Sequence, residues 1–74
     1  MDTQKLVSMA NQIGQFFEPM PDRGQAQEDI ARHIRAFWDP RMRRQMLAHL
    51  DQHHGAGLTD IVLQAFTQHR QQLE

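Results

Sequence analysis

The chain contains no cysteine, and this absence removes two common ways of stabilising a small protein. Without thiols it can form neither a disulfide nor a thiolate metal site. With 74 residues it can bury only one modest core, so a single domain covering residues 1–74 is predicted. Oligomerisation or docking on a larger protein is the remaining source of added stability.

Long apolar runs and a large excess of charge of one sign are also absent. No segment approaches the ~20 apolar residues that span a bilayer, and the first residues do not resemble a secretory signal peptide. A cytoplasmic protein without a membrane segment is therefore expected. The formal net charge of −1 argues against a protein that coats nucleic acid.

Residues that usually carry catalysis do not occur in catalytic arrangements. The single serine, Ser8, lies within a helical pattern, and no glycine run follows a strand to hold a phosphate. His49 and His53 are one helical turn apart, but no third ligand is placed beside them, and the zincin motif requires Glu directly after the first His. We predict no catalytic residue, no cofactor-binding residue and no metal ligand, and we interpret the two histidines as a surface pair.

The sequence does contain apolar side chains at helical spacing. Steps of three and four residues predict four helices, over residues 3–18, 22–38, 40–53 and 59–73, and no segment has the alternation of a strand. The predicted fold class is all-α, a small single-domain bundle or array of four short helices.

Capping and breaking residues support these boundaries. Pro19 ends the first helix, and the glycines at positions 55 and 57 end the third. The residues expected to cap the starts of the helices are Asp2 or Thr3, Asp22, Asp39 ahead of Pro40, and Thr59.

Two residues of the first helix do not fit a simple amphipathic pattern. Gly14 costs ~1 kcal/mol relative to alanine inside a helix, a cost that either a close helix approach offsets or the helix simply tolerates. Phe16 lies off the main apolar stripe, so this helix presents apolar surface in two directions. Self-association of the isolated chain through Phe16 or Trp38 is left open.

The segment from Arg32 to Arg44 carries the most information in the chain. Its five arginines and one acid, Asp39, give a local charge of +4, so the rest of the chain sums to −5. Arginine, tryptophan, phenylalanine and methionine occur together here, and these residue types are enriched at the centres of protein interfaces. The partner-binding residues hypothesised from this pattern are Arg35, Trp38, Arg41, Met42, Arg43 and Arg44, together with Phe16.

Other interpretations of this segment remain open. Phe37 is expected in the core, while Trp38 fits the core and a partner surface equally well. The arginines fit docking on a partner, internal ion pairs with Asp22, Glu28 or Asp29, or contact with nucleic-acid phosphates. The alternative function is therefore a small helical nucleic-acid-binding regulator that uses this basic stretch.

An ordered series of short segments resembles a known family. The series contains Met9-Ala10-Asn11-Gln12-Ile13-Gly14 with Phe16-Phe17, Met20-Pro21-Asp22-Arg23, His33-Ile34-Arg35, Phe37-Trp38-Asp39-Pro40-Arg41-Met42-Arg43 and Gly55-Ala56-Gly57-Leu58. Together they resemble the delta subunit of the bacterial soluble, NAD-dependent, molybdenum-containing formate dehydrogenases. The resemblance extends over nearly the whole chain.

The resemblance implies a non-catalytic accessory subunit that holds no cofactor and acts in assembly or stability of the complex. The implied partners are the larger subunits, which hold the molybdenum cofactor, the iron–sulfur clusters and the flavin. No nucleic acid and no membrane are implied. This agrees with the absence of ligand sets and with a concentrated aromatic and arginine segment.

Overall fold

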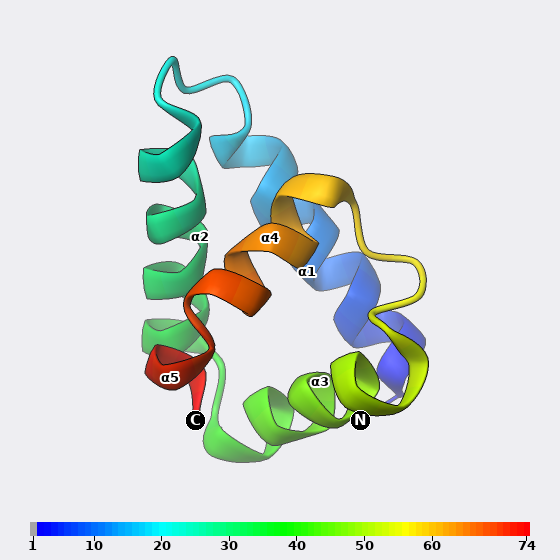
Figure 1. Ribbon diagram of the computed structural model, residues 1–74. Helices are drawn as coiled ribbons and strands as arrows, with labels where there is room; N and C mark the ends of the chain where they lie inside the picture. The colour runs from blue at the N-terminus through cyan, green and yellow to red at the C-terminus, as the bar shows by residue number, and fades with distance from the viewer. Residues whose placement is uncertain (1) are drawn as a thin grey trace.

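The computed structural model describes residues 2–74, and these residues form an all-α fold without strands. The helices are α1 (Thr3–Phe17), α2 (Arg23–Phe37), α3 (Pro40–His53), α4 (Asp60–Gln68) and α5 (Arg70–Leu73). In Figure 1, α1 and α2 lie side by side, α3 crosses the end of this pair, and α4 lies across its face. The short α5 turns back against α2 and α3. The predicted all-α class is confirmed.

Aspartates begin the first three helices, as the sequence predicts. The side chains of Asp2, Asp22 and Asp39 accept hydrogen bonds from backbone N–H groups one turn into α1, α2 and α3, at 3.1, 3.1 and 3.0 Å. Each carboxylate satisfies a donor that has no partner within the helix and lies at the positive end of the helix dipole. A proline lies directly beside two of these caps, since Pro21 precedes Asp22 and Pro40 follows Asp39.

The core lies where α4 packs into the valley between α1 and α2. Its largest fully buried side chains include Phe66 and Ile61 of α4 and Ile30 and Ile34 of α2. The complete buried cluster is Leu6, Ala10, Ala26, Ile30, Ile34, Trp38, Met46, Leu47, Ile61, Val62, Ala65, Phe66 and Leu73. Every helix contributes to it, so the chain forms a single core.

A close approach of α1 and α4 occurs at Gly14, which resolves the question that the sequence left open. A Cβ atom at this position would overlap Cγ2 of Val62 on α4. One turn earlier, Asn11 donates to the carbonyl of Gly57 and accepts from the N–H of Thr59, both at 3.0 Å. Gly14 and Asn11 thus fix the start of α4 against the face of α1.

The start of the fourth helix differs from the prediction. Thr59 occupies the cap position, but its side chain makes no capping hydrogen bond. Its backbone N–H donates to Asn11 Oδ1, a tertiary contact that holds the residue ahead of α4 against α1. With Thr59 at the cap position, the helix begins at Asp60.

The predicted helix 59–73 is also broken at His69, into α4 and α5. The Thr67 hydroxyl donates to the carbonyl of Leu63 at 2.8 Å, a bond within the helix that favours bending. The break turns α5 so that Leu73 becomes fully buried. The helix is interrupted at His69, and the interruption allows Leu73 to be buried.

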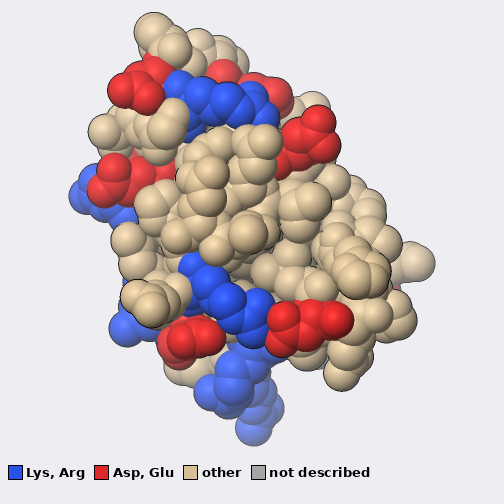
Figure 2. Space-filling model, in the orientation of Figure 1, with Lys and Arg blue, Asp and Glu red and all other residues tan. Residues whose placement is uncertain are grey.

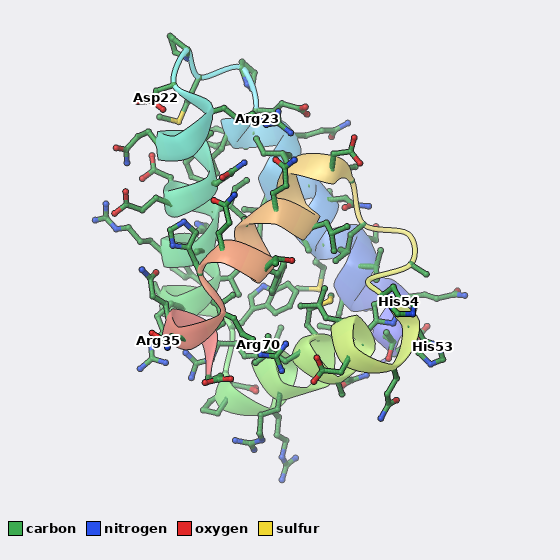
Figure 3. The ribbon with its side chains drawn as sticks, viewed as in Figure 1. Asp22, Arg23, Arg35, His53, His54 and Arg70 are labelled. Atoms are coloured by element: carbon green, nitrogen blue, oxygen red, sulfur yellow. The ribbon has the colours of Figure 1, made fainter. Side chains whose placement is uncertain are left out.

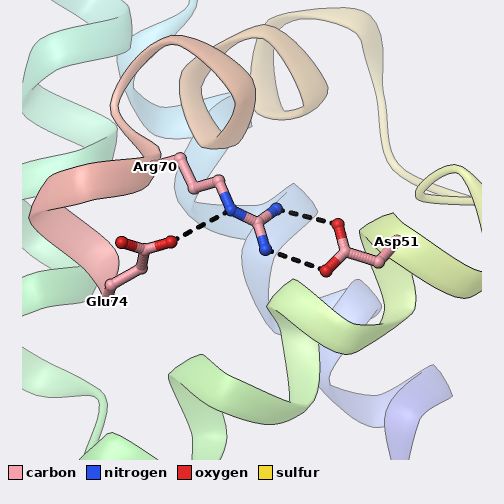
Figure 4. A network of polar contacts seen from close by, with 3 residues as sticks. All are labelled: Asp51, Arg70 and Glu74. Carbon is pink, nitrogen blue, oxygen red and sulfur yellow. Dashed lines mark hydrogen bonds and ion pairs between the residues drawn. The ribbon is translucent and has the colours of Figure 1, made fainter.

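Arg70 fastens α5 to α3. Its guanidinium donates two parallel hydrogen bonds to Asp51, at 3.0 and 2.8 Å, and a third to Glu74 at 3.2 Å (Figure 4). The bonds to Asp51 are the main cause of a raised pKa for Arg70. This planar, bidentate contact fixes direction better than a single ion pair, so it orients the C-terminal turn.

The Gly14 contact gives a test of the packing. Gly14→Ala should lower the free energy of unfolding by about 1–3 kcal/mol, because overpacking against Val62 outweighs the gain in helix propensity. Chemical denaturation followed by circular dichroism measures this change. The matched control is Gly24→Ala, where the new Cβ would lie at an ordinary 3.4 Å from Asp22, and its stability should stay equal or rise. Equal stability of the two variants would contradict the close approach.

Candidate partner-binding surface

An open apolar groove of about 560 Å³ lies between α1, α2 and the start of α3. The α1 wall is formed by Met9, Gln12, Ile13, Phe16 and Phe17. The opposite wall is formed by His33, Phe37, Trp38 and Met42. Although surface grooves usually mix polar and apolar side chains, only Gln12 and His33 are polar here. We call this feature the aromatic groove.

Two phenylalanines on the walls of the aromatic groove are strongly exposed. Phe16 is 77% and Phe37 is 73% exposed, and no other large apolar side chain among residues 2–74 is classed as exposed. Aromatic rings in contact with one another connect the two. The distances between ring centroids are 5.0 Å from Phe16 to Phe17, 6.3 Å from Phe17 to His33 and 4.6 Å from His33 to Phe37. Exposed apolar side chains concentrated in one hollow are typical of an interaction surface.

The expectation that Phe37 belongs to the core is wrong. The apolar stripe of α2 continues from Ile34 to Trp38, which is only 5% exposed and lies 6.4 Å from Phe66 between ring centroids. Because α2 ends at Phe37, the extended backbone of Trp38 turns the indole inward and leaves the preceding phenyl ring outside. Trp38 is thus both a core residue and part of the groove wall.

The hypothesised arginines occupy different environments. Arg41 and Arg44 are exposed in the first turns of α3, and neither forms an ion pair within residues 2–74. In Figure 2, basic side chains project from the end of the molecule where α3 begins. We call this pair the α3 arginines.

Arg35 lies away from the α3 arginines. Its Nη1 donates to the carbonyl of Gln72 at 3.1 Å, and Figure 3 shows it beside α5. The one internal pair formed by Arg32 is with Asp29, at 3.7 Å. Internal carboxylates therefore account for Arg32 in this segment and leave the α3 arginines unmatched.

Arg43 is a buried residue, only 8% exposed. Its Nε and Nη1 atoms have no hydrogen-bond partner within the described part of the chain. Unpaired buried donors oppose stability, because their hydration is lost and not replaced. Arg43 differs in this respect from its neighbours on α3, and its charge does not contribute to the exposed surface.

The histidines of α3 lie close to the loop that follows this helix, and His49 contacts it. His49 Nε2 lies 2.8 Å from the carbonyl of Ala56, and the rings of His49 and His53 are 5.6 Å apart between centroids. Figure 3 shows His53 and His54 at the end of this helix. Residues 2–74 contain no group of three or more His, Cys, Asp or Glu side chains placed to hold a metal ion.

Comparison with known proteins identifies the family. The model of the NADH-dependent formate dehydrogenase delta subunit family, FdsD, matches residues 5–66. The chain belongs to this family. Neither the curated proteins nor the solved structures that were searched give a match. The resemblance inferred from the sequence is thereby confirmed.

The family model covers most of this delta subunit but not its last helix. Residues 5–66 include all of the aromatic groove and the α3 arginines, whereas α5, with Arg70 and Leu73, lies outside the match. Among residues 2–74, no helix combines the length and apolar character needed to cross a bilayer. The groove is therefore a feature of the family-matched helices.

Sequence reasoning missed most of the aromatic groove. It included Phe16, Trp38 and Met42 but not the other residues that line the groove, and it placed Phe37 in the core. A signal was present in the paired aromatics, since neighbours in a helix point about 100° apart and cannot both face one core. In each of the pairs Phe16-Phe17 and Phe37-Trp38, one ring is exposed and its neighbour is more buried.

The two adjacent aromatics at the end of α2 provide a matched test. Trp38→Ala should lower the free energy of unfolding by about 3–5 kcal/mol, because it empties a core position against Phe66. Phe37→Ala should change it by less than about 1 kcal/mol, because the ring is mostly in solvent already. Denaturant titration of both variants measures the difference, and a larger loss from Phe37→Ala would contradict the described end of α2.

Proposed function

We propose that this chain is a non-catalytic accessory subunit of an NAD-dependent formate dehydrogenase, and that it assists assembly or stability of the complex by docking on the larger subunits. Family membership supports the association with formate dehydrogenase. The partners we infer are the molybdenum-containing catalytic subunit and the flavin and iron–sulfur subunits, as the resemblance implies. The same resemblance supports a cytoplasmic location.

The observation that carries the proposal is the unmatched charge of the α3 arginines. Arg41 lies in the first turn of α3, where the positive end of the helix dipole disfavours a cation by about 0.3–1 kcal/mol, and Arg44 lies one turn further along. The nearest acid in sequence, Asp39, is already engaged as the helix cap. This arrangement is unfavourable in the isolated chain, and an acidic surface on a partner would relieve it.

The burial of Arg43 supports the same conclusion by a different route. Its unpaired nitrogens reduce the stability of a domain that has little to spare at 74 residues. Binding a partner that recognises only the folded chain adds stability by mass action. An accessory subunit that is completed by docking is consistent with both features.

Reversing the charge of the α3 arginines tests the proposal. In the chain produced together with the larger subunits, Arg41→Glu with Arg44→Glu should weaken association by about tenfold or more, because attraction becomes repulsion at both positions. The complex recovered by affinity purification and its salt dependence measure this effect. Wild-type association should weaken as salt rises, and the variant should lose most of that dependence.

The control makes the same charge change elsewhere on the surface. Lys5→Glu with Arg32→Glu also lowers the charge by four units, at exposed positions on α1 and α2. Its complex should form as in the wild type. If the α3 variant assembles normally, the α3 arginines are not the docking site, and salt-sensitive retardation of DNA by the wild type alone would favour the nucleic-acid alternative.

A further inference from the structure

Resting on the function proposed above, we infer that the aromatic groove receives an amphipathic helix of a larger subunit, with its acidic C-terminal end against the α3 arginines. The inference names the occupant of a groove whose lining is otherwise unexplained. It depends on the chemistry of the walls, on the charge at one side and on the shape of the rest of the surface.

The walls require an occupant with an apolar face. No Asp, Glu, Lys or Arg lines the groove, and the side chains that do are chiefly aromatic rings and methionines. Methionine adapts to irregular partners, and aromatic rings bury large areas. A volume of about 560 Å³ lies within the ~300–1,000 Å³ typical of binding pockets. It leaves room for several side chains, such as those at i, i+3 or i+4, and i+7 of one helix.

Charge sets the direction of that helix. The side of the groove formed by Trp38 and Met42 is the N-terminus of α3, and Arg41 is the residue directly before Met42. The positive end of α3 and the two α3 arginines favour negative charge at this side. A helix offers partial negative charge at its C-terminus through its free carbonyl groups. Acidic residues of the partner at this end would add to that charge and pair with the α3 arginines.

A second copy of the chain does not fit the groove as well. Phe16 and Phe37 are the exposed large apolar side chains of residues 2–74, and both belong to the groove itself. A copy therefore offers no apolar ridge to insert, and two copies placed groove to groove would oppose two hollow surfaces. The convex apolar stripe of a helix from another subunit complements the hollow directly.

Site-specific crosslinking in the assembled enzyme identifies the occupant. We would replace Phe37 with the photo-crosslinking residue p-benzoyl-phenylalanine in the full chain, produce it with the larger subunits, irradiate the complex and map the products by mass spectrometry. The expected product joins position 37 to a segment of a larger subunit with apolar residues at i, i+3 or i+4, and i+7 and acidic residues at its C-terminal end. The same replacement at Ala36, which lies outside the groove, should not yield that product.

A pair of variants separates this inference from the proposed function. Phe16→Ser with Phe37→Ser should weaken association at least about tenfold, whereas Gln15→Ser with Ala36→Ser, their exposed neighbours, should leave it unchanged. Thermal unfolding of both double variants, followed by circular dichroism, should match that of the wild type within a few degrees, which confirms that folding is intact.

The outcomes distinguish the two ideas. If the phenylalanine variant assembles normally while Arg41→Glu with Arg44→Glu does not, the groove is not the helix site and the docking function stands. If both variants assemble normally, both ideas are overturned. Crosslinks to a second copy of this chain, or to a segment without an apolar stripe, would also overturn the helix assignment.

Discussion

The close approach of α4 to α1 at Gly14 determines how the rest of the molecule is arranged. Because no side chain stands between Gly14 and Val62, α4 can sink into the valley between α1 and α2 and bury Ile61, Val62 and Phe66 there. A single short helix, α4, fills this valley. The other apolar side of α1 and α2 is left with only the start of α3 to cover it, and the aromatic groove is what remains uncovered.

This division explains why two pairs of adjacent aromatics lie near the ends of α1 and α2. In each pair, one ring is more deeply placed and the other is exposed, as Trp38 at 5% and Phe37 at 73% show most clearly. The chain breaks at His69, between α4 and α5, so that Leu73 reaches the core, and the side of α1 and α2 that carries the groove stays open.

The sequence alone predicts the helices well and their surroundings less well. Caps such as Asp22 and Asp39 act within one helical turn, so local residue types suffice to place α2 and α3. The break at His69 accompanies a contact of Arg70 with Asp51, and the placement of α4 against α1 involves a contact of Thr59 with Asn11. In both cases the partner comes from a distant part of the chain. Local patterns carry no information about these pairs.

The hypothesised partner-binding residues include both buried and exposed side chains, which the sequence alone did not distinguish. Composition marked the segment around Arg41 as interface-like, but composition does not say which side chains face outward. The end of α2 turns Trp38 inward, and the pitch of α3 carries Arg43 into a buried position while Arg41 and Arg44 stay outside. Family membership, by contrast, was accessible from the ordered series of short segments because it needs no geometry.

The groove and the α3 arginines would contribute to docking in different ways. Apolar burial in a groove is short-ranged and supplies most of the affinity, while exposed guanidinium groups act at longer range and favour one orientation. The core against α4 contains Phe66, Ile61 and Val62, whereas the exposed rings of Phe16 and Phe37 lie outside it. Trp38 is a core residue that also lines the groove, and four further groove residues pack against the core: Met9, Ile13, Phe17 and Met42. Occupation of the groove can therefore stabilise the core through these shared side chains.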